Sequence, residues 1–415
     1  MRLLFSAMAL AFLVFGCASE RLGVPPPNDR LDTPISIVKH PSGRYLYIAN
    51  AGFEREFRGG RIAVYDLQQH RFLDEASLEI GLFAGQLGLR AYTDGDGDEK
   101  LMGIAVTRDP SAFVQFNVDA TRGDSPKHFD STSIATTFDG GKFADAPYGV
   151  AVDDEGVTVT HLNGRAVSRW LVDSEDPGRI VFGCSLNLSA GASMVARHPN
   201  TGDWYITDRR GTQVTVIKAS PAAAAGEGDA INAGCELTVV DTTELNSLGS
   251  RGIAFSADGS LMYLASLSEE ALRVYDTSVG VGGIARKRLL HLQPLGGVPT
   301  TVSVAGCRPC ECPTGPVGPN CPAQVTLPGS ALDRLGNGLV YVSVYNENKV
   351  IAFDPSTRSV VGRIEVGTTP YELAIAVDNY ERIRGYAVNF KGDAISVIEL
   401  TPGDPRQFKL IAVAD

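Results

Sequence analysis

One strand pattern recurs seven times along this chain and constrains the fold more than any other feature. Each copy has an alternating apolar strand that begins at Pro or a small residue, then a turn, then a second apolar strand with a polar end, then a third strand. Successive third strands end 44 to 78 residues apart, which suits one structural unit repeated with insertions. These ends fall near Asp66, Asp119, Asp173, Ile217, Asp276, Asp354 and Ile398.

The repeat predicts strands joined by hairpins. Apolar residues alternate with period two, and Gly, Asp or Asn stands at the breaks. A period near about 45 residues is the size of a four-stranded propeller blade, which buries its apolar faces only when stacked against other blades. We therefore predict an all-β fold, a seven-bladed β-propeller of four-stranded antiparallel blades, over residues 34–415.

Three segments carry a family resemblance. The stretches YIAN, VIAFD and RIEVGTTPYELAIAVD resemble the YVTN-type (WD40-like) β-propeller repeats, and the resemblance runs from about Pro34 to the C-terminus. It implies the propeller fold. It leaves the function open, because propellers include both enzymes and scaffolds.

The N-terminus is typical of an export signal. Arg2 precedes an apolar run over Leu3–Gly16, which is too short to cross a bilayer comfortably and has the length of a signal-peptide core. The run ends in LVFGC, which resembles the bacterial lipobox. That resemblance implies removal of residues 1–16 and acylation of Cys17 with a diacylglycerol and palmitate-type chains. Ala18 after the cysteine implies the outer membrane.

The mature chain would then be an envelope lipoprotein. Residues 17–33 are expected to form a Pro-rich tether, which Pro25, Pro26 and Pro27 stiffen. A net charge of −11 without a Lys/Arg block argues against nucleic acid as a partner.

Six further cysteines favour disulfides over metal ligation, because the count is even and the envelope is oxidising. Four of them lie in CRPCECPTGPVGPNC, where Cys307–Cys312 with Cys310–Cys321 and Cys307–Cys310 with Cys312–Cys321 both stay open. Pairing of Cys310 with Cys312 is disfavoured because one intervening residue strains the bridge. The other two, Cys184 and Cys235, occupy similar places in neighbouring blades and can pair.

The cysteine cluster belongs to an insertion at about residues 305–327. We place it in the hairpin between the first two strands of blade six, because Val302 and Val304 keep the apolar alternation before it. A strand beginning at Pro328 would instead put it between blades five and six. In the first arrangement, one face of the propeller is expected to carry the insertion, the Asp94 turn and the loop with Arg122-Gly123-Asp124. The ends of the second strands are expected at the opposite face.

Those second-strand ends define a predicted polar ring at the channel mouth. His161 and Asp208 come from neighbouring blades and are weak candidates for a catalytic base and its orienting group. Resemblance to propeller lactonases and gluconolactonase-like hydrolases implies a cation site, to which Asp208, Asn50 and Asn389 could contribute. The polar members of the ring are Asn50, Thr107, His161, Asp208, Ser266 and Asn389, with Val344 at the remaining position.

Alternate carboxylates mark a weak Ca²⁺ candidate. Asp94, Asp96 and Asp98 have the spacing that opens a Ca²⁺ loop, but Glu99 stands where the loop needs Gly and Ala105 where it needs the closing Glu. A solvated Asp-Gly turn at the hairpin tip of blade two is the alternative. No other cofactor is expected.

Two functions follow from this reading. The first is a lipid-anchored scaffold or binding module for an envelope or cell-surface protein or glycan. The alternative is a hydrolase of the lactonase or gluconolactonase kind, or another propeller enzyme, with its site at the channel mouth. The lack of a dense catalytic constellation favours the first.

Overall fold

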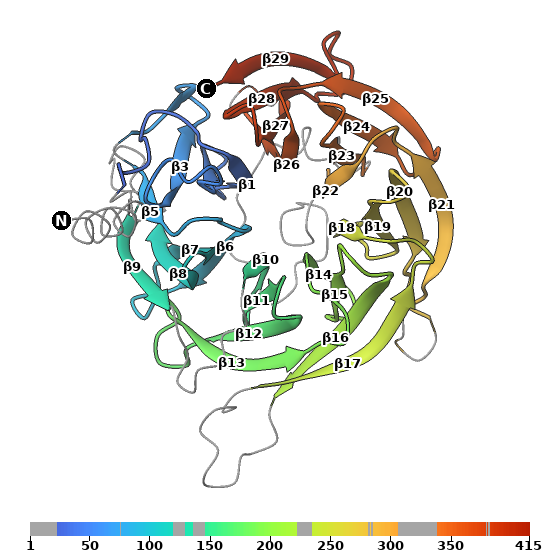
Figure 1. Cartoon of the computed structure of the whole chain (residues 1–415), viewed down its shortest axis with the longest axis horizontal. Coiled ribbons are helices and arrows are strands. Elements are labelled where there is room, and N and C mark those ends of the chain that lie inside the picture. The colour runs from blue at the N-terminus through green and yellow to red at the C-terminus, as the bar shows by residue number, and fades with distance from the viewer. Residues whose placement is uncertain are drawn as a thin grey trace, which may run out of the picture.

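Seven antiparallel sheets stand around a central axis as the blades of a propeller (Figure 1). The computed structural model describes residues 23–415 except 75, 119–128, 136–145, 222–234, 281–282, 284, 306–337, 379 and 381. Within these residues all regular structure is β-strand. The predicted fold, an all-β seven-bladed propeller of four-stranded blades, is confirmed.

Consecutive strands build each blade from the axis outward. Blades one and two contain β1 Pro34–Lys39, β2 Tyr45–Asn50, β3 Gly60–Asp66, β4 Arg71–Phe72, β5 Leu78–Ile80, β6 Leu87–Thr93, β7 Glu99–Arg108, β8 Ser111–Val118 and β9 Phe129–Ala135. Blades three and four contain β10 Pro147–Asp153, β11 Gly156–His161, β12 Ala166–Val172, β13 Ile180–Asn187, β14 Val195–Arg197, β15 Trp204–Thr207, β16 Gln213–Pro221 and β17 Cys235–Glu244. Blades five to seven contain β18 Ser250–Phe255, β19 Leu261–Ser266, β20 Ala271–Asp276, β21 Arg288–Pro294, β22 Pro299–Val304, β23 Val340–Val344, β24 Lys349–Asp354, β25 Ser359–Glu365, β26 Pro370–Val377, β27 Ile383–Asn389, β28 Ala394–Glu399 and β29 Lys409–Ala414.

The ring closes without an exchanged strand. Blade one uses only the first strands of the chain and blade seven only the last four. Hydrogen bonds join the two at the seam: Thr33 N–H donates to Asp393 Oδ1 at 2.7 Å, and Ile37 N–H donates to Glu372 Oε2 at 3.1 Å. The two ends of the propeller are therefore held by side-chain contacts rather than by a shared sheet.

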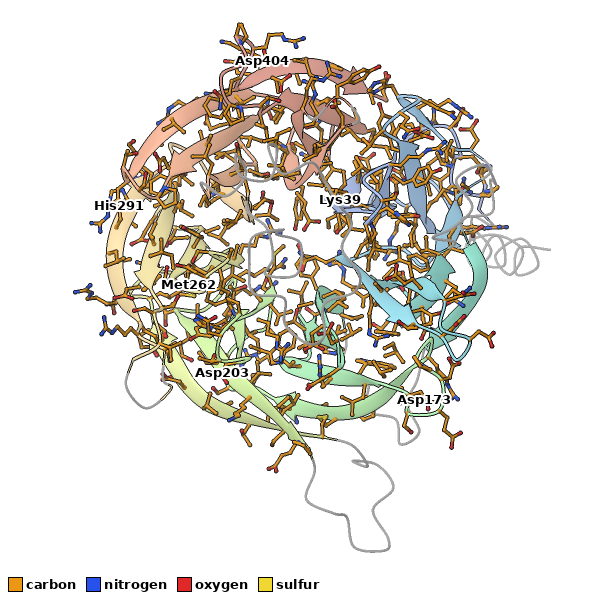
Figure 2. All side chains as sticks on the ribbon, turned by 180° about the vertical axis from the view of Figure 1, so that it is seen from behind. Lys39, Asp173, Asp203, Met262, His291 and Asp404 are labelled. Carbon is orange, nitrogen blue, oxygen red and sulfur yellow. A yellow bond between two sulfur atoms is a disulfide. The ribbon has the colours of Figure 1, made fainter. Side chains whose placement is uncertain are left out.

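The apolar core lies between neighbouring blades. Phe113 of blade two stacks on Trp170 of blade three, with ring centres 4.1 Å apart and planes 10° apart. Figure 2 shows the ring from behind, with Met262 inside blade five and His291 on its outer strand at the rim. Met262 is fully buried. The period-two alternation places apolar side chains on the faces of each sheet, and stacking of the blades buries these faces.

The Asp that ends many third strands caps the following turn. Asp66 Oδ1 accepts the N–H groups of Gln68 and Gln69 at 2.7 and 3.0 Å, and Asp354 Oδ1 accepts that of Ser356 at 2.8 Å. A carboxylate that binds the backbone two residues ahead stabilises a tight turn. This explains why the repeat carries Asp at that position.

The cysteine insertion lies between the first two strands of blade six, as the apolar alternation at Val302 and Val304 predicted. The first strand of blade six, β22, pairs with β23, so residues 306–337 connect these two strands. The competing strand that begins at Pro328 would lie within this connection, and that reading was wrong. Cys307, Cys310, Cys312 and Cys321 lie outside the described residues, and their pairing stays a prediction.

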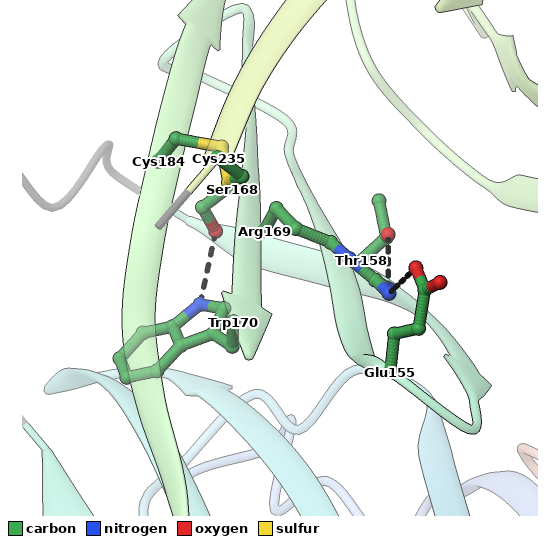
Figure 3. Close-up of a disulfide and its surroundings, with 7 residues drawn as sticks. All are labelled: Glu155, Thr158, Ser168, Arg169, Trp170, Cys184 and Cys235. Carbon is green, nitrogen blue, oxygen red and sulfur yellow. Dashed lines mark hydrogen bonds and ion pairs between the residues drawn. A yellow bond between two sulfur atoms is a disulfide. The ribbon is translucent and has the colours of Figure 1, made fainter. Parts of the chain in front are cut away.

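A disulfide joins the outer strands of blades three and four. Cys184 of β13 is bonded to Cys235 of β17, with Cα atoms 5.6 Å apart, as Figure 3 shows. This pairing was predicted. The bond is a second covalent link between blades three and four, in addition to the chain segment between β13 and β14.

Two further predicted features lie outside the described residues. These are the N-terminal segment with Cys17 and the loop with Arg122-Gly123-Asp124. The part of the chain that the structure describes contains no helix long and apolar enough to cross a membrane.

Candidate functional site

The innermost strands begin with a β-bulge in five of the seven blades. In blade three, for example, Pro147 pairs with His161, yet the next pair is Val150 with Val159, so the inner strand carries one extra residue. Such a bulge redirects side chains and is common beside functional sites. The residues that follow the first bulge residue in blades three, five, six and seven are Tyr148, Arg251, Thr300 and Tyr371.

Two of these side chains meet across the channel. The hydroxyl groups of Tyr148 on β10 and Tyr371 on β26 contact each other, although their strands belong to blades three and seven. Both tyrosines are buried. Burial, and then the neighbouring Tyr148, raises the pKa of Tyr371 well above its usual range. Tyr371 is therefore neutral at physiological pH, and its hydroxyl group acts as a hydrogen-bond donor and acceptor.

A cation from blade five lies against this pair. The guanidinium carbon of Arg251 is 4.9 Å from the ring centre of Tyr371, and the side chain also hydrogen-bonds Tyr148. Burial by itself lowers the pKa of Arg251, but Tyr371 and Tyr148 outweigh it and raise the pKa. Arg251 Nε is buried and has no hydrogen-bond partner among the described residues.

A second arginine sits in an aromatic box beside the first. The guanidinium of Arg108, at the end of β7, lies 5.1, 5.6 and 5.7 Å from the rings of Phe53, Phe83 and Tyr148. Its Nε donates to the carbonyl of Phe83 at 2.9 Å. Its Nη2 is buried and has no partner within the described parts of the chain. Burial lowers the pKa of Arg108, as do the charges of Arg209 and Arg251.

Aromatic rings continue this arrangement around the mouth. Phe53 packs edge-on against Phe83 and Phe390, with ring centres 5.1 and 5.2 Å apart, and Phe390 lies 6.0 Å from Tyr371. Phe53 remains 37% exposed, and Tyr345, which contributes to the raised pKa of Arg251, remains 36% exposed. We call the set Phe53, Arg108, Tyr148, Arg251, Tyr345 and Tyr371 the mouth cluster.

A polar network next to Tyr371 joins the inner strands of neighbouring blades. Glu372 follows Tyr371, and its Oε1 accepts from Gln86 Nε2 at 3.1 Å, while Gln86 Oε1 accepts from the N–H of Val150 at 3.2 Å. With the bond from Ile37, this network joins blades seven, one, two and three. Glu372 is only partly exposed, and burial raises its pKa. Both of its oxygens are engaged in holding inner strands together.

In the sequence, the predicted polar ring includes positions that come directly before residues of the mouth cluster, as Thr107 does before Arg108. All six of its polar side chains are buried and face partners near their own blades. His161 Nε2 is 2.9 Å from Ser168 Oγ, and Asp208 accepts from the N–H groups of Gly191 and Arg210 at 2.7 and 2.9 Å. The catalytic pairing of His161 with Asp208 therefore stays a prediction, while their observed contacts stabilise strand ends and turns.

The remaining ring members make similar local bonds. Thr107 donates to the carbonyl of Pro110, Asn50 accepts from the N–H of Asp32, Ser266 donates to Glu269, and Asn389 donates to Ser396. Side chains alternate along a strand, so the next residue faces the other way. Residues directly after ring positions accordingly reach the mouth: Arg108, Arg209, Tyr345 and Phe390.

The three alternate carboxylates of blade two form the predicted hairpin tip between β6 and β7. Asp94 Oδ1 accepts the N–H groups of Asp96 and Asp98 at 3.0 and 2.9 Å, and Lys100 Nζ lies 3.5 Å from both Asp94 and Asp98. The backbone bond from Asp98 keeps the pKa of Asp94 low. In the described residues no group of three or more His, Cys, Asp or Glu could hold a metal ion. Ca²⁺ binding here stays a prediction.

Two open cavities lie away from the mouth. One, of about 660 Å³, separates blades seven and one at the rim and is lined by Tyr65, Arg382 and Arg384 among others. The other, of about 410 Å³, lies beside the root of the cysteine insertion, at Ala305 and Gly338. Of the three arginines that line the first cavity, Arg382 is ion-paired with Asp378 at 2.8 Å and Arg384 with Glu399, while Arg71 Nε donates to Gln69 Oε1 at 2.8 Å. We therefore place the candidate site at the mouth, where Arg251 Nε and Arg108 Nη2 are buried and lack a partner within the described part of the chain.

The mouth cluster has a signal in the sequence that the prediction did not use. It is the second residue of each inner strand. PYGVAV, SRGIAF and PYELAI align at these starts, and their second residues are Tyr148, Arg251 and Tyr371. Glycine follows in the first two, where a Cβ would stand 2.6 Å from Ser193 O or Thr301 Cα of the next blade. These glycines let inner strands pack closely while their neighbours turn to the axis.

Comparison with solved structures supports the propeller fold and nothing finer. No protein-family model matches the sequence. No curated protein matches it well enough to count as a relative.

A Kuenenia stuttgartiensis hydrazine synthase chain superposes with a TM-score of 0.55 at 14% identity, over 92% of this chain and 98% of that one. The β-propeller domain of Myceliophteria thermophila Cps50 (Swd1) gives 0.54 at 11%, over 90% and 98%. A Bacteroides uniformis protein described as a candidate 6-phosphogluconolactonase gives 0.52 at 12%, over 82% and 88%. At these identities the likeness concerns the fold alone.

Proposed function

We propose that this protein is a ligand-binding module of the bacterial envelope, anchored in the outer membrane through lipidated Cys17, whose ligand binds at the mouth cluster. One observation carries the proposal. Arg251 Nε and Arg108 Nη2 are buried donors without partners among the described residues, and aromatic rings surround them. A buried donor left unpaired destabilises a protein by about 1–3 kcal/mol, so such donors are expected where a ligand supplies the acceptor.

The envelope location rests on separate support. The LVFGC motif precedes a Pro-rich tether, and the chain contains a disulfide between Cys184 and Cys235, which suits an oxidising compartment. The tether would hold the propeller away from the membrane, so that a glycan or protein of the envelope or cell surface could reach the mouth. Acyl labelling of the expressed protein tests the anchor. Label should appear on the native chain and be absent from Cys17→Ser.

Binding can be tested with the mature lipidated chain in detergent on a glycan array and by crosslinking to envelope proteins. We expect a defined ligand set for the native chain and its loss in Arg251→Gln. Arg286→Gln removes the same charge from an exposed arginine near Asp276 and serves as the matched control. Equal binding by Arg251→Gln and the native chain would move the site away from the mouth and refute the proposal.

A hydrolase at the same mouth is the second candidate. It is favoured by Glu372, a carboxyl next to Tyr371 whose pKa burial raises, as catalytic acids and bases often require. Against it, both Glu372 oxygens already bind Gln86 and the inner strand of blade one. Lactone and ester hydrolysis by the mature chain decides the matter. Turnover that Glu372→Gln abolishes without unfolding the chain would replace the binding module with an enzyme.

A further inference from the structure

The geometry points to an acidic sugar as the ligand of the mouth cluster, with its oxyanion on Arg251 and Arg108 and its ring against the exposed aromatic side chains. This inference rests on the proposed binding function and names the chemistry of the ligand. A uronate carboxylate and a sugar phosphate both supply this chemistry, and the experiment below separates them.

Hydrogen-bond accounting at the mouth shows more donors than acceptors. Each arginine has five N–H donors and no acceptor, and each tyrosine hydroxyl has one donor. One of the two hydroxyl hydrogens is used in the contact between Tyr148 and Tyr371, so the other needs an acceptor elsewhere. Arg251 Nε and Arg108 Nη2 also have no partner among the residues that the structure describes. A single group with several acceptor oxygens and no donor would satisfy this excess, and a carboxylate or phosphate is such a group.

The charges at the mouth also call for an anion. The groups that dominate the pKa of Arg251, besides burial, are Tyr371, Tyr148 and Tyr345, and none of these is a carboxylate. Arg209 adds a third positive charge close enough to lower the pKa of Arg108. This cationic site stands in a chain with a net charge of −11, so the attraction is local to the mouth.

The rings beside the arginines suit a sugar rather than a bare anion. Phe53 and Tyr345 are each more than one-third exposed at the mouth, whereas the tyrosines below them are buried. An exposed aromatic face stacks on the apolar face of a pyranose and excludes water from polar contacts beside it. In a uronate or a hexose phosphate the oxyanion is attached near such a ring face, which matches two arginines flanked by aromatic side chains.

Calorimetric titration of the mature chain tests this inference with glucuronate, glucose 6-phosphate and glucose as probes. We expect one or both anions to bind and glucose to bind at least about tenfold more weakly. The stronger anion identifies the carboxylate or the phosphate source. Arg251→Gln and Arg108→Gln should each weaken the anion by at least about tenfold, and Arg286→Gln should leave it unchanged. Added salt should weaken binding as it screens the charges.

A second variant keeps the test sharp if a buried arginine substitution disturbs folding. Phe53→Ala changes an exposed ring and should weaken glucuronate or glucose 6-phosphate severalfold while leaving inorganic phosphate or acetate unaffected. The inference fails if glucose binds as tightly as the anions, or if neither anion binds up to about 10 mM. If the native chain binds a neutral glycan on the array and Arg251→Gln does not, the binding function stands. Only the assignment of the ligand as an acidic sugar is then overturned. Anion binding that survives all mouth substitutions would refute both.

Discussion

Arginines with buried guanidinium nitrogens occur in two contrasting settings in this propeller. In blade seven, Arg384 contacts the fully buried carboxylate of Glu399, and its Nε lies 3.6 Å from Asp378. At the channel mouth, Arg251 and Arg108 lie among tyrosine and phenylalanine rings, and each keeps a buried donor without a partner among the described residues. The same side chain is neutralised by carboxylates in one place and left uncompensated in the other.

The difference separates a structural from a functional use of charge. A buried charge is tolerated when a well-placed opposite charge and hydrogen bonds offset its desolvation, as around Arg384. The groups that raise the pKa of Arg251 are the tyrosines Tyr371, Tyr148 and Tyr345, and no carboxylate is among them. Local arrangements that lower stability without compensation are expected at functional sites, because selection acts there on binding rather than on folding. The mouth arginines fit this description.

The largest expected effect comes from breaking the compensated pair. Glu399→Gln keeps the shape of the side chain but removes the charge in contact with Arg384, whose Nε then faces the more distant Asp378 at 3.6 Å. We expect the free energy of unfolding to fall by about 3–5 kcal/mol, the usual loss when one partner of a buried ion pair is removed. Urea unfolding followed by circular dichroism measures it.

A matched control uses an exposed pair. Glu347→Gln removes the partner of Lys349, 3.7 Å away with both side chains partly exposed, and should change stability by less than about 1 kcal/mol. A loss from Glu399→Gln as small as that of the control would erase the distinction between the two arginine settings.

A smaller effect is expected at the mouth. Arg251→Met keeps the length of the side chain and removes the unpaired donor and its charge. Without ligand, the free energy of unfolding should change by less than about 1 kcal/mol or should increase, because the lost contacts with Tyr371 and Tyr148 are offset by relief of desolvation. The same urea experiment applies, and a loss comparable to that of Glu399→Gln would show that Arg251 serves the fold.

The propeller could be predicted from the sequence because its cause is local. Period-two alternation, turn residues and the Asp at the end of the third strand each follow from contacts within one blade, such as the bonds from Gln68 and Gln69 to Asp66. The place of the cysteine insertion followed in the same way from Val302 and Val304. Seven repeats of a local rule therefore sufficed for the architecture.

The mouth cluster could not be predicted in the same way, because its contacts join distant blades. The sequence directs attention to polar residues at second-strand ends, yet Asn389 and His161 turn toward Ser396 and Ser168 of their own blades. Tyr148 and Tyr371 are 223 positions apart and meet only once the ring is closed. The bulge that turns them to the axis shows in the sequence only as a Pro-Tyr pair, which has no distinctive chemistry by itself.

An acidic residue at the seam between blades seven and one gives the smallest and most pH-specific test of uncompensated charge. Burial, followed by the nearby charges of Asp393, Glu56 and Glu54, raises the pKa of Asp32 from 3.8 to about 6. The folded chain thus keeps a proton that the unfolded chain releases between these pH values, so the penalty is absent below about pH 4, grows as pH rises, and is complete above about pH 6. Asp32→Asn removes the penalty.

The variant should therefore match the native protein near about pH 4 and exceed it at about pH 7–8, as thermal melts across this range would record. Asp32 is partly exposed, so solvent screening reduces the expected gain to about 1 kcal/mol or less. Asp404→Asn is the matched control, because hydrogen bonds from Arg406 lower the pKa of Asp404 and its removal should not stabilise the chain at higher pH. A gain from Asp32→Asn that is equal at all pH values would show that the amide stabilises the seam through its shape. The pH dependence would then say nothing about uncompensated charge at the seam.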